Sequence, residues 1–128
     1  MKKRSVLISY LGICLALSFM LACPAPGATE YSGVPARGTV TMVDLGAKSC
    51  VPCKLMDPIL KRMGKRYAKK AAVVFIDIRY YPEEAARFRI RAIPTQIFFD
   101  ARGNEVYRHE GFMREEKIIA QFEKMGVK

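Results

Sequence analysis

The chain has 128 residues, of which 51% are hydrophobic and 27% are charged, and its formal net charge is +10. This length accommodates one domain with one hydrophobic core, and the composition excludes an intrinsically disordered chain. The positive charge, concentrated at residues 61–70, is compatible with a solvated surface, with acidic membrane headgroups or with an acidic partner.

The N-terminal residues have the pattern of an export signal. Residues 2–4 are basic and precede an uncharged apolar run at residues 6–22, so residues 1–27 are expected to be a signal peptide, a lipoprotein signal or a membrane anchor. Three outcomes stay open: lipidation of Cys23, cleavage that discards Cys23, and retention of the apolar run in the membrane. Each places the domain outside the cytoplasm, in the periplasm, either soluble or tethered through its N-terminus. We expect no nucleic acid partner for such an exported chain.

The first half of the remaining chain predicts a spacer, a strand and a helix. Residues 28–38 are rich in proline, glycine and small side chains, which is typical of a spacer before a domain at residues 39–128. Residues 39–45 largely alternate between polar and apolar side chains and are rich in β-branched residues, and this pattern predicts a strand. Residues 50–67 carry apolar side chains at helical spacing. These side chains are Leu55, Met56, Ile59, Leu60, Met63 and Tyr67.

The second half predicts a buried strand, a short helix, a hairpin of two strands and a final helix. Residues 72–78 are almost continuously apolar, which is typical of a strand buried on both faces of a parallel sheet. Residues 82–88 form a short helix opened by proline, and residues 95–99 and 105–109 flank a turn and form a hairpin. The order of elements predicts an α/β fold with a central mixed β-sheet flanked by α-helices. The last helix has an inward stripe made of Ile118, Ile119, Phe122 and Met125.

Two cysteines remain available for chemistry in the mature chain. Cys14 lies inside the apolar signal, whereas Cys50 and Cys53 lie where the first strand ends and the first helix begins. Free N–H groups and the helix dipole favour a thiolate at Cys50. Cys53 is one turn further along, so a disulfide between the two can open and close with little backbone motion. We expect Cys50 to be the exposed nucleophile and Cys53 to be the resolving thiol.

Two other interpretations of the cysteine pair are weaker. A structural disulfide between residues three apart closes a very small loop and constrains the unfolded chain little. A zinc site needs about four ligands, and the sequence has no second CxxC motif and only one histidine, His109, which we expect on the surface. We therefore expect no metal and no cofactor beyond the redox-active disulfide Cys50–Cys53.

Two separated segments resemble the thioredoxin family. Residues 43–54 (VDLGAKSCVPCK) are similar to the active-site segment of thioredoxins, and residues 56–60 (MDPIL) continue it. Residues 88–95 (FRIRAIPT) are similar to the family segment that carries a cis-proline facing the cysteines. Two such segments at suitable spacing are far more specific than a CxxC motif alone, and they imply a thioredoxin-like fold over roughly residues 39–127.

The resemblance implies roles for further residues. Asp44 would lie beneath Cys53, where burial raises its pKa and lets it exchange a proton with that cysteine, so the expected catalytic set is Cys50, Cys53 and Asp44. Pro94 would be cis and would expose the Ile93 backbone to an extended client strand. The residues expected to contact the client are Val51, Pro52, Ile93, Pro94 and Thr95.

The sequence departs from the family in three respects. Ser49 stands where the family usually has tryptophan, which removes a flat apolar contact for clients. Val51 replaces the usual glycine between the cysteines, so the redox potential of ordinary thioredoxin does not transfer. The spacer is too short for the full first strand and helix of the fold, and we expect a trimmed N-terminal edge.

The resemblance implies a monomeric extracytoplasmic oxidoreductase that reduces disulfides of periplasmic client proteins, apocytochromes among them. Pro52 and the triplet Ile93, Pro94 and Thr95 resemble reducing thioredoxins more than disulfide-introducing enzymes. By family precedent, the electrons would come from a membrane thiol carrier. Two alternatives stay open: a disulfide donor or isomerase, and a non-catalytic binding module in which the disulfide rests while the basic surface docks a partner.

Overall fold

The computed structural model describes residues 31–128; the expected signal at residues 1–27, with Cys23, lies outside the described residues. The elements are β1 (Thr41–Gly46), α2 (Val51–Arg66), β2 (Ala72–Asp77), α3 (Pro82–Arg87), β3 (Thr95–Phe99), β4 (Glu105–Glu110) and α4 (Glu115–Lys124). The predicted α/β order is confirmed, and the predicted strands and the first two helices end within two residues of the observed bounds.

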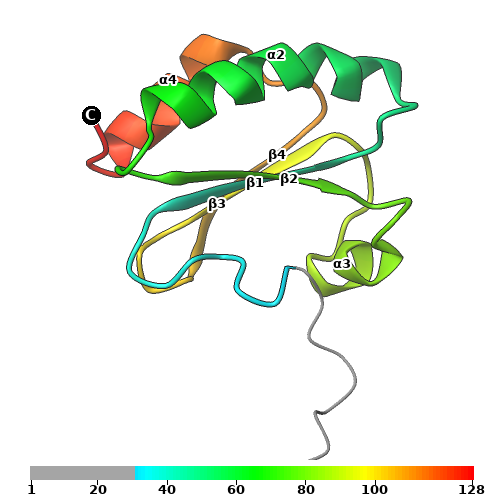
Figure 1. Cartoon of the computed structure of the whole chain (residues 1–128), viewed down its shortest axis with the longest axis horizontal. Coiled ribbons are helices and arrows are strands. Elements are labelled where there is room, and N and C mark those ends of the chain that lie inside the picture. The colour runs from blue at the N-terminus through cyan, green and yellow to red at the C-terminus, as the bar shows by residue number, and fades with distance from the viewer. Residues whose placement is uncertain (1–30) are drawn as a thin grey trace, which may run out of the picture.

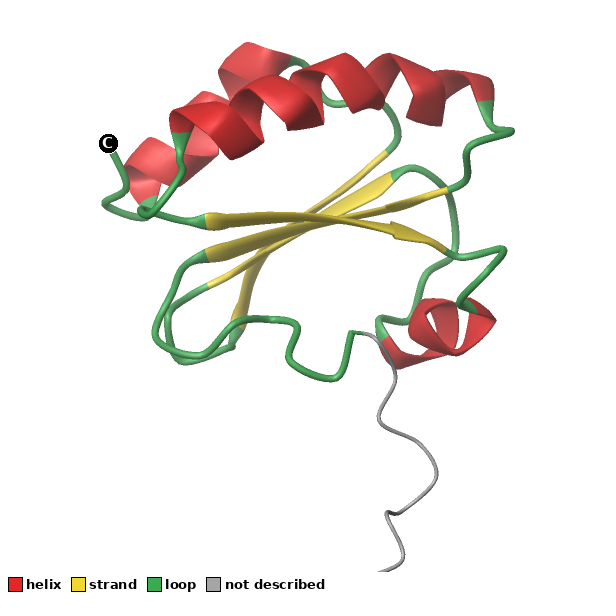
Figure 2. Ribbon diagram, in the orientation of Figure 1, coloured by secondary structure: helices red, strands yellow, loops and turns green. Residues whose placement is uncertain are grey.

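The four strands form one mixed sheet in the order β2-β1-β3-β4. The β1–β2 pair is parallel, whereas the β1–β3 and β3–β4 pairs are antiparallel. Helices α2 and α4 cover one face of the sheet, and α3 lies on the other (Figures 1 and 2). Met42 packs into the core beneath α2 and α4, while Val43 and Leu45 pack into the core on the α3 face. Because side chains alternate along a strand, Asp44 and Gly46 face α2.

The predicted stripe of α4 is confirmed and connects that helix to α2 and the sheet. Ile118 and Phe122 are fully buried, and Ile119 and Met125 pack against the same core cluster. The Phe122 ring lies with its centroid 4.4 Å from that of Tyr67, just after the end of α2. These contacts hold α2 against the sheet and so fix the position of its N-terminal cysteines.

The strand predicted at residues 72–78 pairs in parallel and packs on both faces of the sheet, but it is only partly buried. In the described part of the chain β2 is an edge strand that pairs only with β1, and its side chains are half-buried from Ala72 to Phe75, with Ile76 and Asp77 buried. A continuous apolar run shows that a strand packs on both faces but does not specify which strands flank it. No strand or helix precedes β1 within residues 31–40, and the expected trimmed edge stays a prediction.

Residues 31–38, expected to be an unpacked spacer, contact the domain. Tyr31 and Val34 pack against the core on the α3 face. The Arg87 guanidinium donates a hydrogen bond of 3.0 Å to the carbonyl of Tyr31 and another to the carbonyl of Val34. Part of this segment therefore packs against the domain, which its sequence does not indicate, because a segment without helix or strand periodicity gives no sign of its contacts with distant residues. The remaining domain boundaries stay predictions.

Within residues 31–128, every helix is too short or too polar to cross a lipid bilayer.

Candidate active site

Cys50 and Cys53 form a disulfide at the N-terminus of α2, with 5.2 Å between their Cα atoms. Cys50 is the N-cap residue of α2, and its Sγ accepts a hydrogen bond of 3.4 Å from the Cys53 N–H. Cys50 is half-buried, whereas Cys53 is only 4% exposed. The predicted placement of the pair at the strand–helix junction is confirmed. In the reduced protein, a first-turn N–H would stabilise negative charge on the more accessible sulfur.

The turn that carries Cys50 is fastened to the end of β2. The Cys50 N–H donates to the carbonyl of Ala47 at 3.0 Å, and the Lys48 N–H donates to Oδ2 of Asp77 at 3.1 Å. The other oxygen of Asp77 accepts from the Arg79 N–H at 3.0 Å. Our sequence interpretation missed this role of Asp77, although a carboxylate at the carboxyl end of a strand parallel to β1 was the available signal.

Gly46 allows Cys53 to rest directly on the end of β1. A Cβ atom at Gly46 would lie 3.2 Å from both the Cβ and the Sγ of Cys53, and 3.3 Å from the ring of Phe75. These distances are shorter than ordinary van der Waals contacts, so a side chain at residue 46 would force Cys53 or Phe75 to move by a few tenths of an ångström. This residue was also missed from the sequence, since its contacts depend on how α2 crosses the strand.

The proline loop lies at the same end of the sheet as the disulfide. Leu45 pairs with Thr95 in the antiparallel register of β1 and β3, so Pro94, one residue earlier, falls level with Gly46. The Ile93–Pro94 peptide bond is cis, and Pro94 is buried. Since Gly46 contacts Cys53, the two sequence segments that resemble the family meet here.

The residues expected to contact a client differ in exposure. Val51 is 70% exposed and Pro52 is also exposed, while Ile93 is half-buried. Thr95 is fully buried, and its hydroxyl donates a hydrogen bond of 2.7 Å to the carbonyl of Ala92. The Thr95 side chain therefore shapes the proline loop from within, and the surface available to a client comes from the other residues of the set.

Asp44 is a buried carboxyl on the α2 face of β1. It is 0% exposed, and its Oδ1 accepts a hydrogen bond of 2.7 Å from Nε2 of Gln96 on β3. Burial raises the pKa of Asp44 to about 6, and the Gln96 hydrogen bond acts in the opposite direction. The predicted direction of the pKa shift is confirmed. Gln96 was missed, although a polar residue inside an otherwise apolar strand marks a buried polar contact.

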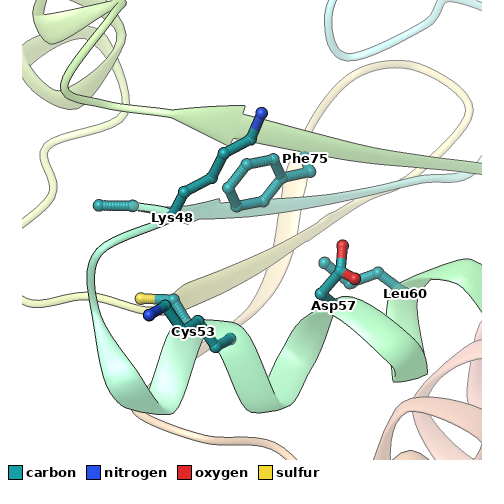
Figure 3. Close-up of a pocket in the computed structure, with 7 residues that line it drawn as sticks. Lys48, Cys53, Asp57, Leu60 and Phe75 are labelled. Carbon is teal, nitrogen blue, oxygen red and sulfur yellow. The ribbon is translucent and has the colours of Figure 1, made fainter.

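A pocket of about 340 Å³ opens beside Cys53, between α2, β2 and the turn after β1. Figure 3 shows Lys48 reaching in from the turn, Phe75 from β2, and Asp57 and Leu60 from α2. The complete lining is Ala47, Lys48, Cys53, Lys54, Asp57, Leu60 and Phe75. The buried Cys53 thus borders an opening that carries two lysines and a carboxylate.

No group of three or more potential metal ligands occurs among residues 31–128. The expectation of a site without metal or separate cofactor stays a prediction.

Comparisons with known proteins agree with the geometry of this end of the sheet. A family model described as Thioredoxin matches residues 31–124. A thioredoxin-like protein of Synechocystis is 35% identical over 82 residues, which cover 64% of this chain and 77% of that protein. Thioredoxin of Staphylococcus saprophyticus is 35% identical over 85 residues, covering 66% of this chain and 81% of the relative.

Solved structures show the same fold. The thioredoxin Deadhead of Drosophila melanogaster superposes with a TM-score of 0.62 at 27% identity, over 69% of this chain and 82% of that one. Thioredoxin of Fasciola hepatica gives a TM-score of 0.61 at 27% identity, over 70% and 83% of the two chains. The predicted thioredoxin-like fold is therefore confirmed.

Proposed function

We propose, since this chain belongs to the thioredoxin family, that it is a thiol-disulfide oxidoreductase that works outside the cytoplasm and reduces disulfides of client proteins. The observation that carries the proposal is the Cys50–Cys53 disulfide at the N-terminus of α2, with Cys50 half-buried and Cys53 buried. Family membership and this disulfide support the general redox activity. The direction of electron transfer, the cellular compartment and the identity of the clients are what we propose.

In the first step, the Cys50 thiolate attacks a client disulfide. A bond forms between Sγ of Cys50 and one client sulfur, the client disulfide breaks, and the second client sulfur leaves as a thiolate. The Cys53 N–H that points at Sγ of Cys50 favours the attacking thiolate.

In the second step, Cys53 resolves the mixed disulfide. Its thiol gives a proton to the Asp44 carboxylate, and the resulting thiolate attacks Sγ of Cys50. The client sulfur bonded to Cys50 leaves as a thiolate, both client thiolates take protons from water, and the Cys50–Cys53 disulfide forms, so two electrons pass from the protein to the client. Asp44 suits this exchange because its pKa of about 6 lies close to neutral pH, and because it shares the α2 face of β1 with Gly46, against which Cys53 packs.

Clients would bind as extended segments across the end of the sheet. The Ile93 backbone precedes the buried Pro94 and offers hydrogen-bonding groups to such a strand, and Val51 and Pro52 offer exposed apolar surface beside Cys50. Tyr80, 66% exposed, follows the β2 end that holds the Cys50 turn. It can supply an aromatic contact that Ser49 does not.

The setting outside the cytoplasm follows from the export pattern of residues 1–27. We propose a monomer in the periplasm, soluble or tethered through its N-terminus, with apocytochromes among its clients and a membrane thiol carrier as its electron donor. Deletion of the carrier should leave Cys50 and Cys53 oxidised in cells, whereas an unchanged, fully reduced pair would contradict that partner. Mass spectrometry of the mature N-terminus decides the fate of Cys23.

Reduction of insulin disulfides tests the activity. The wild-type protein should reduce insulin, and Cys50→Ser should lose the activity, while Ser49→Ala, with the pair intact, should keep it. Equal reduction by wild type and Cys50→Ser would refute the catalytic assignment, and no reduction by the wild type would favour a binding module.

The redox potential separates a reductase from a disulfide donor or isomerase. Equilibration with glutathione measures this potential, and a value nearer to about −270 mV than to the value of strong oxidants, about −120 mV, would support reduction. A value near the second figure would assign the protein to disulfide donation.

A further inference from the structure

Asp44 and Gln96 lie opposite each other on adjacent strands, at one pair of the β1–β3 register. Both side chains are 0% exposed, and the Gln96 Nε2 lies 2.7 Å from Oδ1 of Asp44. Among the described residues, the buried side-chain polar atoms without a hydrogen-bond partner are Oδ2 of Asp44 and Oε1 of Gln96. The two unpaired atoms thus belong to the two groups that one hydrogen bond already joins.

Both unpaired atoms are oxygens, so neither can satisfy the other while Asp44 is ionised. Turning the Gln96 amide over would only place its oxygen against Oδ1 and lose the existing bond. A single proton satisfies both atoms, because a carboxylic acid at Asp44 has an O–H at Oδ2 that can donate to Oε1 of Gln96. We infer that protonated Asp44 and Gln96 close a ring of two hydrogen bonds, and that Gln96 is the positioning residue that retains the proton taken from Cys53.

No other neighbour can substitute for Gln96 in this role. On β2, Asp44 lies opposite the uncharged Phe75, and the nearby Asp77 carboxylate is occupied by two backbone N–H groups. On α2, it faces the region of Cys53. The remaining charged groups near that region line the pocket beside Cys53 and are Lys48, Lys54 and Asp57. None of them forms a hydrogen bond with Asp44 among the described residues.

The inference rests on the proposed resolving step and makes it more specific. The proton leaves Sγ of Cys53 and binds to Oδ2 of Asp44, where Oε1 of Gln96 accepts the new O–H. The acid form then has two hydrogen bonds and the carboxylate has one. As a simple donor, by contrast, the Gln96 amide stabilises the carboxylate and lowers the pKa of Asp44. The two arrangements make opposite predictions for removal of the Gln96 amide.

The test is a pH titration of the Asp44 carboxyl by carbon-13 NMR in the disulfide form of the full chain, in which neither Cys50 nor Cys53 titrates. In Gln96→Met, the midpoint should fall by about 0.5 to 1 pH unit, the equivalent of one neutral hydrogen bond. Gln121→Met, a matched change at a half-buried glutamine of α4, should leave the midpoint unchanged. A rise of the midpoint in Gln96→Met would overturn the ring and would show that the Gln96 amide acts only as a hydrogen-bond donor to the Asp44 carboxylate.

A second measurement needs no variant. Below the midpoint, the wild-type protein should show an exchange-protected carboxyl proton with a nuclear Overhauser contact to the Gln96 amide, and absence of this proton would contradict the ring. Because both spectra are recorded on the disulfide form, they do not depend on client reduction. If the protein fails to reduce insulin but the midpoint falls in Gln96→Met, the proposed function alone is rejected. If the protein reduces insulin but the midpoint rises in Gln96→Met, the ring alone is rejected.

Discussion

Gly46 and Cys53 are in such close contact that a Cβ atom at residue 46 would lie 3.2 Å from the Cys53 sulfur. This contact joins the end of β1 to the first turn of α2 and places the resolving sulfur on the strand that carries Asp44. In the proposed mechanism, client reduction is therefore sensitive to a side chain at this one position of β1.

Gly46→Ala should displace Cys53 and slow client reduction. The added methyl group would lie 3.2 Å from the Cys53 side chain and 3.3 Å from the Phe75 ring, and such overpacking costs about 1 to 3 kcal/mol of the free energy of unfolding. Urea unfolding and insulin reduction measure the two effects. Gly64→Ala is the matched control: a Cβ at Gly64 of α2 has no atom within 4 Å, so it should stabilise the helix by about 0.5 to 1 kcal/mol. Equal behaviour of the two variants would contradict the account of this contact.

Asp77→Ala should loosen the turn that carries Cys50. The change leaves the N–H groups of Lys48 and Arg79 without their carboxylate partner, and loss of a buried hydrogen-bonding group costs about 1 to 3 kcal/mol. Asp57→Ala, which removes an exposed ion pair with Lys61, should change the stability by less than about 1 kcal/mol. Chemical denaturation of the two variants side by side makes the comparison, and an equal loss in both would show that the Asp77 contact is dispensable.

Asp44 should make the stability depend on pH in a defined window. Its pKa rises from 3.8 to about 6 on folding, so between these values the folded protein holds a proton that the unfolded chain has released. The free energy of unfolding relative to Asp44→Asn should therefore fall as pH rises from about 4 to 6, by roughly 3 kcal/mol in total, and stay level outside this window. Urea unfolding across this range measures the difference. A difference that increases with pH would contradict a raised pKa.

Tyr80→Ala should weaken client binding without altering the redox pair. Tyr80 is 66% exposed and its N–H donates to the carbonyl of Asp77 at 3.1 Å, and the Asp77 carboxylate accepts from the Lys48 N–H in the turn that leads to Cys50. We expect a KM for a protein client about five to ten times higher, the loss of roughly 1 to 1.4 kcal/mol of aromatic contact, with an unchanged redox potential. An unchanged KM would remove Tyr80 from the client surface.

The features that the sequence predicted correctly depend on local patterns. The placement of Cys50 and Cys53 follows from a strand, a short turn and an amphipathic helix, each visible within a few residues. The position of the Pro94 loop followed from resemblance, because nothing local indicates that it lies level with the end of β1.

The features that were missed depend on which residues meet across the fold. The contact of Gly46 with Cys53 depends on the crossing of α2, Gln96 acts through the β1–β3 register, and Asp77 acts through the parallel pairing of β2 with β1. The partial exposure of β2 was missed for a similar reason, since apolar content reflects packing on the faces of a sheet and not the order of its strands.

Trapping of mixed disulfides tests the central claim most directly. In cells that express Cys53→Ala, client proteins should accumulate in disulfide linkage to Cys50, identified by mass spectrometry, because the resolving thiol is gone. The wild type and a Cys50→Ala, Cys53→Ala double variant should accumulate none. Absence of adducts on Cys50 in Cys53→Ala, or equal adducts in the double variant, would contradict the assignment of Cys50 as nucleophile and Cys53 as resolving thiol.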